Sequence, residues 1–71
     1  MNDDQKERIS KLRDKLERIW ISVEKQEEVE EWLETNTLCF NLCNEGLEYE
    51  VYKTIIAVIE EQLAIQKNVS L

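Results

Sequence analysis

The sequence predicts an all-α fold, a small three-helix domain, and three observations predict it. Proline is absent and glycine occurs once in 71 residues, so few residues favour turns. Glu, Lys and Leu, which favour helices, are abundant. Apolar residues recur every three or four positions over long stretches, which is the period of an amphipathic helix. We expect helices at about 3–24, 28–44 and 48–66 in a single domain over 1–71, with residues 67–71 frayed.

The first helix begins with a candidate capping box, in which Asn2 and Gln5 satisfy each other's backbone N–H groups. Its apolar residues share an arc of about 100° and are Ile9, Leu12, Leu16, Ile19, Trp20 and Val23. A stripe this narrow predicts one packing partner. The charged residues on the other side predict a solvated face.

After Val23 the apolar period breaks, and it resumes out of register at Val29. The break predicts a connection or kink near 24–28, with a single bent helix as the alternative. The acidic residues at 24, 27, 28, 30 and 31 lack the Asp and Gly spacing of a calcium loop, and they suit the first turns of a helix. Gly46 is placed to end the second helix in the left-handed conformation, with Leu47 making the apolar contact of a Schellman cap.

Apolar residues of the third helix spread over an arc of about 180°, whereas packing on one domain needs a little over 100°. The segment 55–59 also has strand character, but its length and the lack of a hairpin signal favour a helix. The surplus apolar surface predicts a second covered face, either against a partner chain or within a crowded core.

The sequence gives no catalytic or metal site, and we expect no enzyme activity and no cofactor. The chain has no histidine and two cysteines, Cys39 and Cys43, whose neighbours in sequence are acidic. A nucleophilic thiol needs a base or positive neighbours, and structural zinc favours Cys and His. One helical turn separates Cβ atoms by about 5–6 Å, whereas a disulfide needs about 3.8 Å. Both cysteines are therefore predicted to pack as small apolar residues.

The charge is uneven along the chain. Residues 1–20 carry six basic and five acidic side chains, a net of +1, and residues 21–71 carry three basic and eleven acidic, a net of −8. The total of −7 argues against nucleic acid and anionic membranes as partners. No apolar run has the length of a signal-peptide core or a membrane span, which predicts a cytosolic location with reduced thiols.

Residues 34–60 resemble the MOZART family of small mitotic-spindle organising proteins. The family pattern has Glu-Thr, then Cys, Leu-Cys, Gly, Glu and a helix rich in Val and Ile. Here these elements are Glu34-Thr35, Cys39, Leu42-Cys43, Gly46, Glu50 and Ile55-Ile56. The chain departs from the pattern at Asn36, where the family tends to carry Leu, and at Glu48-Tyr49, where it usually has Asn-Pro.

The resemblance implies a non-catalytic adaptor that folds together with helical N-terminal regions of gamma-tubulin complex proteins. It implies a role in microtubule nucleation and spindle organisation, a heteromeric state, and a location at the microtubule-organising centre, centrosome or spindle pole. Two alternatives remain open: an acidic helical inhibitor of a basic protein partner, and a self-associating subunit of a helical bundle.

The apolar residues divide into two predicted sets, one for a partner and one for the internal core. Those predicted to bind a partner are Leu38, Leu42, Leu47, Val51, Ile55, Val58 and Ile65. Those predicted to form the core are Ile9, Leu12, Leu16, Ile19, Trp20, Trp32, Leu33, Phe40, Tyr52, Ile56 and Ile59. Structural roles are further assigned to Gly46, Cys39, Cys43, Trp20, Trp32 and Phe40.

Overall fold

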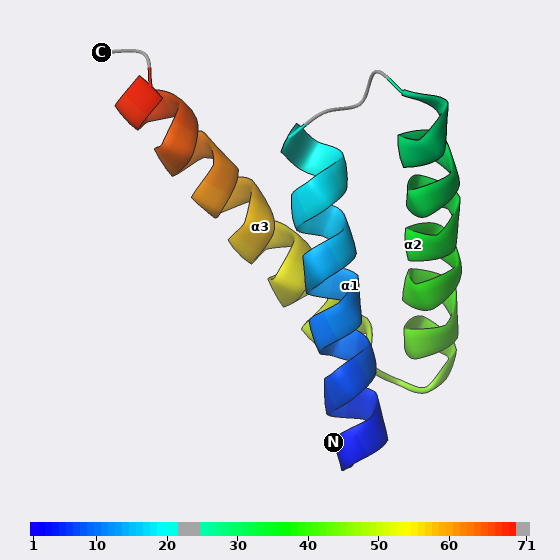
Figure 1. Cartoon of the computed structure of the whole chain (residues 1–71). Coiled ribbons are helices and arrows are strands. Elements are labelled where there is room, and N and C mark those ends of the chain that lie inside the picture. The colour runs from blue at the N-terminus through cyan, green and yellow to red at the C-terminus, as the bar shows by residue number, and fades with distance from the viewer. Residues whose placement is uncertain (22–24, 70–71) are drawn as a thin grey trace.

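The computed structural model describes residues 1–21 and 25–69, and these form three helices and no strand (Figure 1). They are α1 (Asp3–Ile21), α2 (Gln26–Asn44) and α3 (Glu48–Val69). The predicted all-α, three-helix fold is therefore confirmed. The molecule measures 41 × 25 × 16 Å, and α2 runs antiparallel to α1, so the chain reverses direction between these two helices (Figure 1). The break in apolar period thus marks a connection between two helices and not a bend within one.

The helix boundaries differ from the predicted ones at two places. α2 begins at Gln26 and not at residue 28. α3 continues to Val69, so residues 67–69, which the sequence led us to expect as frayed, are helical. The predicted end of the first helix at residue 24 lies outside the described residues.

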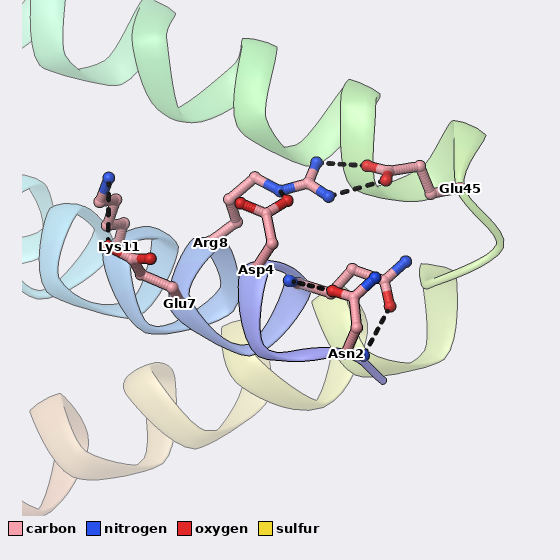
Figure 2. Close-up of polar contacts among 7 residues, drawn as sticks. Asn2, Asp4, Glu7, Arg8, Lys11 and Glu45 are labelled. Carbon is pink, nitrogen blue, oxygen red and sulfur yellow. Dashed lines mark hydrogen bonds and ion pairs between the residues drawn. The ribbon is translucent and has the colours of Figure 1, made fainter.

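The capping box at the start of α1 is present as predicted. The backbone N–H of Gln5 donates to Oδ1 of Asn2 at 2.8 Å, and that of Asn2 donates to Oε1 of Gln5 at 3.1 Å (Figure 2). Asp3 and Asp4 follow in the first turn, where negative charge interacts favourably with the helix dipole. These contacts fix where α1 begins.

A Schellman cap ends α2. Gly46 has φ +80°, the left-handed conformation that glycine adopts without a Cβ clash. The N–H of Leu47 donates to the carbonyl of Leu42 at 3.0 Å, and the N–H of Gly46 donates to that of Cys43 at 3.1 Å. Leu47 also packs against the core cluster that contains Leu42. The cap therefore sets the turn that leads from α2 into α3.

We expect Gly46→Ala to lower the free energy of unfolding by about 1 kcal/mol, because an L side chain is strained at this φ. No atom lies within 4 Å of the position that a Cβ would take, so the loss comes from the backbone and not from a clash. Urea denaturation measures it. Gly46→Asn should lose less, since Asn tolerates the left-handed region. Equal stability of wild type and Gly46→Ala would contradict the cap.

Helix α1 lies between the other two. It packs against both α2 and α3, whereas α2 and α3 contact each other less, and the C-terminal half of α3 diverges from α2 (Figure 1). The prediction of a single packing partner for α1 was therefore wrong. The apolar stripe of α1 is narrow because it fits the angle between two helices, and charged side chains on either side of the stripe complete both contacts.

The core is small and lies where the three helices meet. Its buried apolar residues are Leu12, Ile19, Leu42, Val51 and Val58. Leu12, Leu42 and Val51 form one cluster, and half-buried residues pack around it, namely Ile9, Leu16, Leu38, Cys39, Cys43, Leu47 and Ile55. A fully buried aliphatic side chain contributes about 1.5–3 kcal/mol. Because the core contains so few of them, we expect a domain of modest stability.

The predicted division of faces was wrong for α2 and α3. Leu42, Val51 and Val58, assigned to a partner, are buried inside the chain, and Leu38, Leu47 and Ile55 are half-buried against the core. The residues of these helices assigned to the core are mostly exposed, namely Trp32, Leu33, Phe40, Tyr52 and Ile56, and only Ile59 is half-buried. On α1 the predicted core residues are buried or half-buried except Trp20, which is exposed.

Candidate protein-interaction surface

Helix α2 carries an exposed apolar stripe. Val29, Leu33 and Phe40 recur at helical spacing, with exposed fractions of 48%, 54% and 66%, and Trp32 lies beside them at 49%. Asn36 stands within the same stripe and is also exposed. Several large apolar side chains exposed on one side of a helix indicate a contact surface, in contrast to single exposed ones.

Helix α3 carries a second stripe of the same kind. Tyr49, Tyr52, Ile56 and Leu63 are exposed, and they fall within about 60° of one another around the helix. Ile65 is exposed as well but lies on a different side of α3, about 160° from Leu63. The ammonium group of Lys53 lies 5.0 Å from the ring centre of Tyr49.

Both stripes face away from α1. On α2, Glu34 pairs with α1 and so marks the side that faces α1. Measured around the helix from Glu34, the buried Leu42 lies at about 80°, and the exposed Val29 and Phe40 lie at about 220–240°. On α3, Glu61 pairs with α1 and marks the side that faces α1. Measured from Glu61, the buried Val58 lies at about 60°, and the exposed Ile56 and Leu63 lie at about 200–220°. Because α2 and α3 run antiparallel (Figure 1), this shared order places both stripes on one face of the molecule.

An open hollow of about 390 Å³ adjoins this face and is lined by Leu16, Ile19, Trp20 and Trp32. Leu16 and Ile19 come from α1, and Trp32 lies on α2 between its buried side and its exposed stripe. The hollow is apolar and of a size that accepts one large side chain. It extends the surface of α2 towards the core.

The basic side chains of α1 are engaged in ion pairs with acidic side chains. Lys15 pairs with Glu34 and Arg18 with Glu31, both on α2, and Arg13 pairs with Glu61 on α3. Lys11 pairs with Glu7 within α1. The charged face of α1, predicted to be solvated, therefore also joins α1 to α2 and α3. Each exposed ion pair contributes about 0–1 kcal/mol to stability.

The Arg8–Glu45 pair is the best-formed of these contacts (Figure 2). Both terminal nitrogens of the Arg8 guanidinium donate to the Glu45 carboxylate, Nη2 to Oε1 at 2.7 Å, and Nε lies 3.1 Å from Oδ2 of Asp4. A two-pronged contact of this kind fixes orientation as well as distance. It ties α1 to the capping residue of α2. The hydrogen bonds from Arg8 hold the pKa of Glu45 below its ordinary value.

Acidification should therefore weaken the fold through this pair. The contribution of Glu45 is fully present above its unfolded pKa of about 4.3 and is lost as pH falls through its lower folded pKa. We expect the urea midpoint of the wild type to fall more between pH 7 and pH 3 than that of Arg8→Met. Lys11→Met, which removes a pair within α1, is the control. An equal fall in wild type and Arg8→Met would contradict the role of this contact.

Cys39 and Cys43 have free thiols and pack half-buried against the core cluster. Burial raises the pKa of Cys39, and the neighbouring Cys43 raises it further, so its reactive thiolate form is disfavoured at neutral pH. Among residues 1–21 and 25–69 there is no group of three or more Cys, Asp or Glu side chains placed to hold a metal ion. In the same residues, no helix is both long enough and apolar enough to cross a membrane.

Two polar residues are buried that the predicted core did not include. Thr35 is 2% exposed, and its hydroxyl donates to the carbonyl of Glu31 at 2.9 Å. Gln62 is 6% exposed at the centre of the buried side of α3. The orienting signals that sequence analysis missed are the acidic residues that pair with α1, which mark the inner sides of α2 and α3.

Comparison of the chain with models of known protein families, with curated proteins and with solved structures gave no match.

Proposed function

We propose that the chain is a small non-catalytic adaptor that binds a helical segment of a partner protein. The observation that carries the proposal is an inversion of the usual burial. The chain buries the polar side chains of Thr35 and Gln62 and leaves those of Trp32, Leu33 and Phe40 exposed. Proteins bury large apolar side chains in preference to polar ones. A partner protein that covers the exposed apolar side of α2 accounts for why this side faces outward.

The exposed stripes are also large enough to matter energetically. Each apolar side chain that a partner covers contributes about 25 cal/mol per Å² of area removed from water. Aromatic residues are common among those that dominate binding energy at interfaces, and Trp20, Trp32, Phe40 and Tyr52 all retain exposed surface. Their position on one scaffold of packed helices provides a preformed contact site.

The partner in this proposal is a gamma-tubulin complex protein, bound through its helical N-terminal region. Support comes from the resemblance of residues 34–60 to the MOZART pattern. In the structure, Gly46 forms the cap, Cys43 and Leu42 pack in or against the core, and Thr35 is buried. The pattern therefore coincides with the residues that shape the α2–α3 turn. The proposal places the chain at the centrosome or spindle pole, where it supports microtubule nucleation.

Co-purification tests the named partner. The tagged chain is isolated from its native organism, and the eluate is examined for gamma-tubulin complex proteins by mass spectrometry. In parallel, purified chain is mixed with recombinant helical N-terminal segments of those proteins and the complex is sized by light scattering. We expect a stable heteromer. An eluate without these proteins and no complex in the mixture would refute the named partner.

The same sizing distinguishes the remaining alternatives. A symmetric homo-oligomer with a concentration-dependent melting temperature would indicate a self-associating bundle subunit instead. Binding to a basic protein that disappears with added salt, without dependence on the apolar stripes, would indicate an acidic inhibitor.

A further inference from the structure

The face opposite α1 has the form of an incomplete four-helix bundle. α2 and α3 each pack on α1 but contact each other less, and the apolar stripes of both helices lie on this face. Beside the stripe of α2, a hollow lined by Trp32 and by Leu16, Ile19 and Trp20 of α1 lies between α1 and α2. In a four-helix bundle each helix contacts two neighbours around a shared core. Here no helix formed by residues 1–21 or 25–69 occupies the position between α2 and α3 on the side away from α1.

We propose that this face binds one amphipathic helix of another protein, whose apolar stripe is bordered by Lys or Arg along the edge that meets α2. This inference rests on the adaptor function proposed above and adds the docking face and the chemistry of the bound helix. An amphipathic helix is the form that an apolar groove between two helices accepts. One large side chain of the bound helix would enter the hollow beside Trp32.

The charge of α2 selects a basic edge on the partner. Its acidic residues are Glu27, Glu28, Glu30, Glu31 and Glu34, and no Lys or Arg lies between Gln26 and Asn44. Glu31 and Glu34 pair with α1, whereas Glu27 and Glu30 make no ion pair with any described residue. Glu30 lies three residues before Leu33, at the border of the stripe. A Lys or Arg on the bound helix would meet this unpaired charge.

The basic side chains of α1 are not available to neutralise the remaining negative charge of α2. Five basic residues of α1 are already in ion pairs, namely Arg8, Lys11, Arg13, Lys15 and Arg18. A second copy of the chain is a poorer occupant than a basic helix, because two copies of net charge −7 would bring acidic α2 surfaces together.

A pair of synthetic helices tests the proposal directly. The probe is a tryptophan-free peptide of about 18 residues, about 27 Å long as a helix, with a Leu stripe bordered by Lys. A matched peptide has the same stripe bordered by Glu, and a third has the Lys probe's composition with its apolar positions scrambled. Titration into the full chain is followed by the emission of Trp20 and Trp32. We expect the Lys peptide to shift this emission to the blue and to bind at least about tenfold more tightly than either control at low salt.

Matched variants locate the surface. Leu33→Lys and Ile56→Lys should each raise the Kd of the Lys peptide at least about tenfold, since each places a charge in the docked stripe. Ile65→Lys is the control, because Ile65 is as exposed as Leu33 (51% against 54%), undergoes the same change of charge and lies outside both stripes. Far-UV circular dichroism checks that all three variants remain helical. Equal binding by Leu33→Lys and Ile65→Lys would overturn the proposed face.

Charge reversal on α2 tests the second half of the inference. Glu30→Lys, at the border of the stripe, should reduce the preference for the Lys peptide over the Glu peptide, whereas Asp14→Lys on α1 should leave it unchanged. Equal affinity of wild type for the Lys, Glu and scrambled peptides would overturn the inference, as would a homodimer that covers the face.

The outcomes separate this inference from the named partner. If gamma-tubulin complex segments bind wild type and Leu33→Lys alike, the adaptor function stands and the docking face is wrong. If the Lys peptide binds as expected and those segments do not, the docking face stands and the named partner is wrong.

Discussion

Leu42→Ala is expected to lower the free energy of unfolding by about 2–5 kcal/mol. Leu42 has no exposed surface, lies in the cluster with Leu12 and Val51, and supplies the carbonyl that accepts the Schellman bond from Leu47. Truncation removes its apolar contacts and leaves a cavity. A 71-residue domain has a total stability of only about 4–11 kcal/mol, so the variant should lose a large share of it and unfold at a clearly lower urea concentration.

Phe40→Ala is the matched control, two residues away on the same helix. Phe40 is 66% exposed, so its truncation should change stability by less than about 0.5 kcal/mol. Urea denaturation of both variants, followed by circular dichroism, gives the comparison. The reverse order, with Phe40→Ala the more damaging, would mean that α2 is rotated about its axis relative to the structure described above.

Local signals in the sequence were sufficient for the number of helices and for two of their ends. The pairing of Asn2 with Gln5 and the left-handed Gly46 are both interactions within a few residues, and both are present. Such features depend on the backbone of one segment. They follow from composition and spacing without knowledge of the rest of the fold.

The rotation of each helix about its axis could not be predicted in the same way. The apolar pattern of α2 predicts that its most apolar side faces inward, with Phe40 and Leu33 buried. In the structure the inner side is marked instead by Glu31 and Glu34, which pair with Arg18 and Lys15 of α1. These contacts join residues far apart in the chain, so no local period reveals them. The wide apolar arc of the third helix did correctly indicate that more surface exists than one small core covers.

The position of Gln62 gives the second large effect. We expect Gln62→Met to raise the free energy of unfolding by about 0.5–2 kcal/mol, which is the cost of removing most of an amide from water with partial compensation. Gln62 is 6% exposed, forms no hydrogen bond or ion pair with any described residue, and keeps its amide atoms in slight contact with solvent. Met has a similar length and no amide, so it fills the same space without that penalty.

The control for this substitution is a second glutamine of α3, Gln66. Gln66→Met, at an exposed position, should change stability by less than about 0.5 kcal/mol. Thermal and urea unfolding of the two variants against wild type give the comparison. A gain confined to Gln62→Met would show that the chain retains a polar core residue at a cost in stability while apolar surface remains outside, an arrangement that is common where a surface serves binding. A loss in Gln62→Met would show that the amide is needed by the folded chain, and only the exposed stripes of α2 and α3 would then indicate a partner.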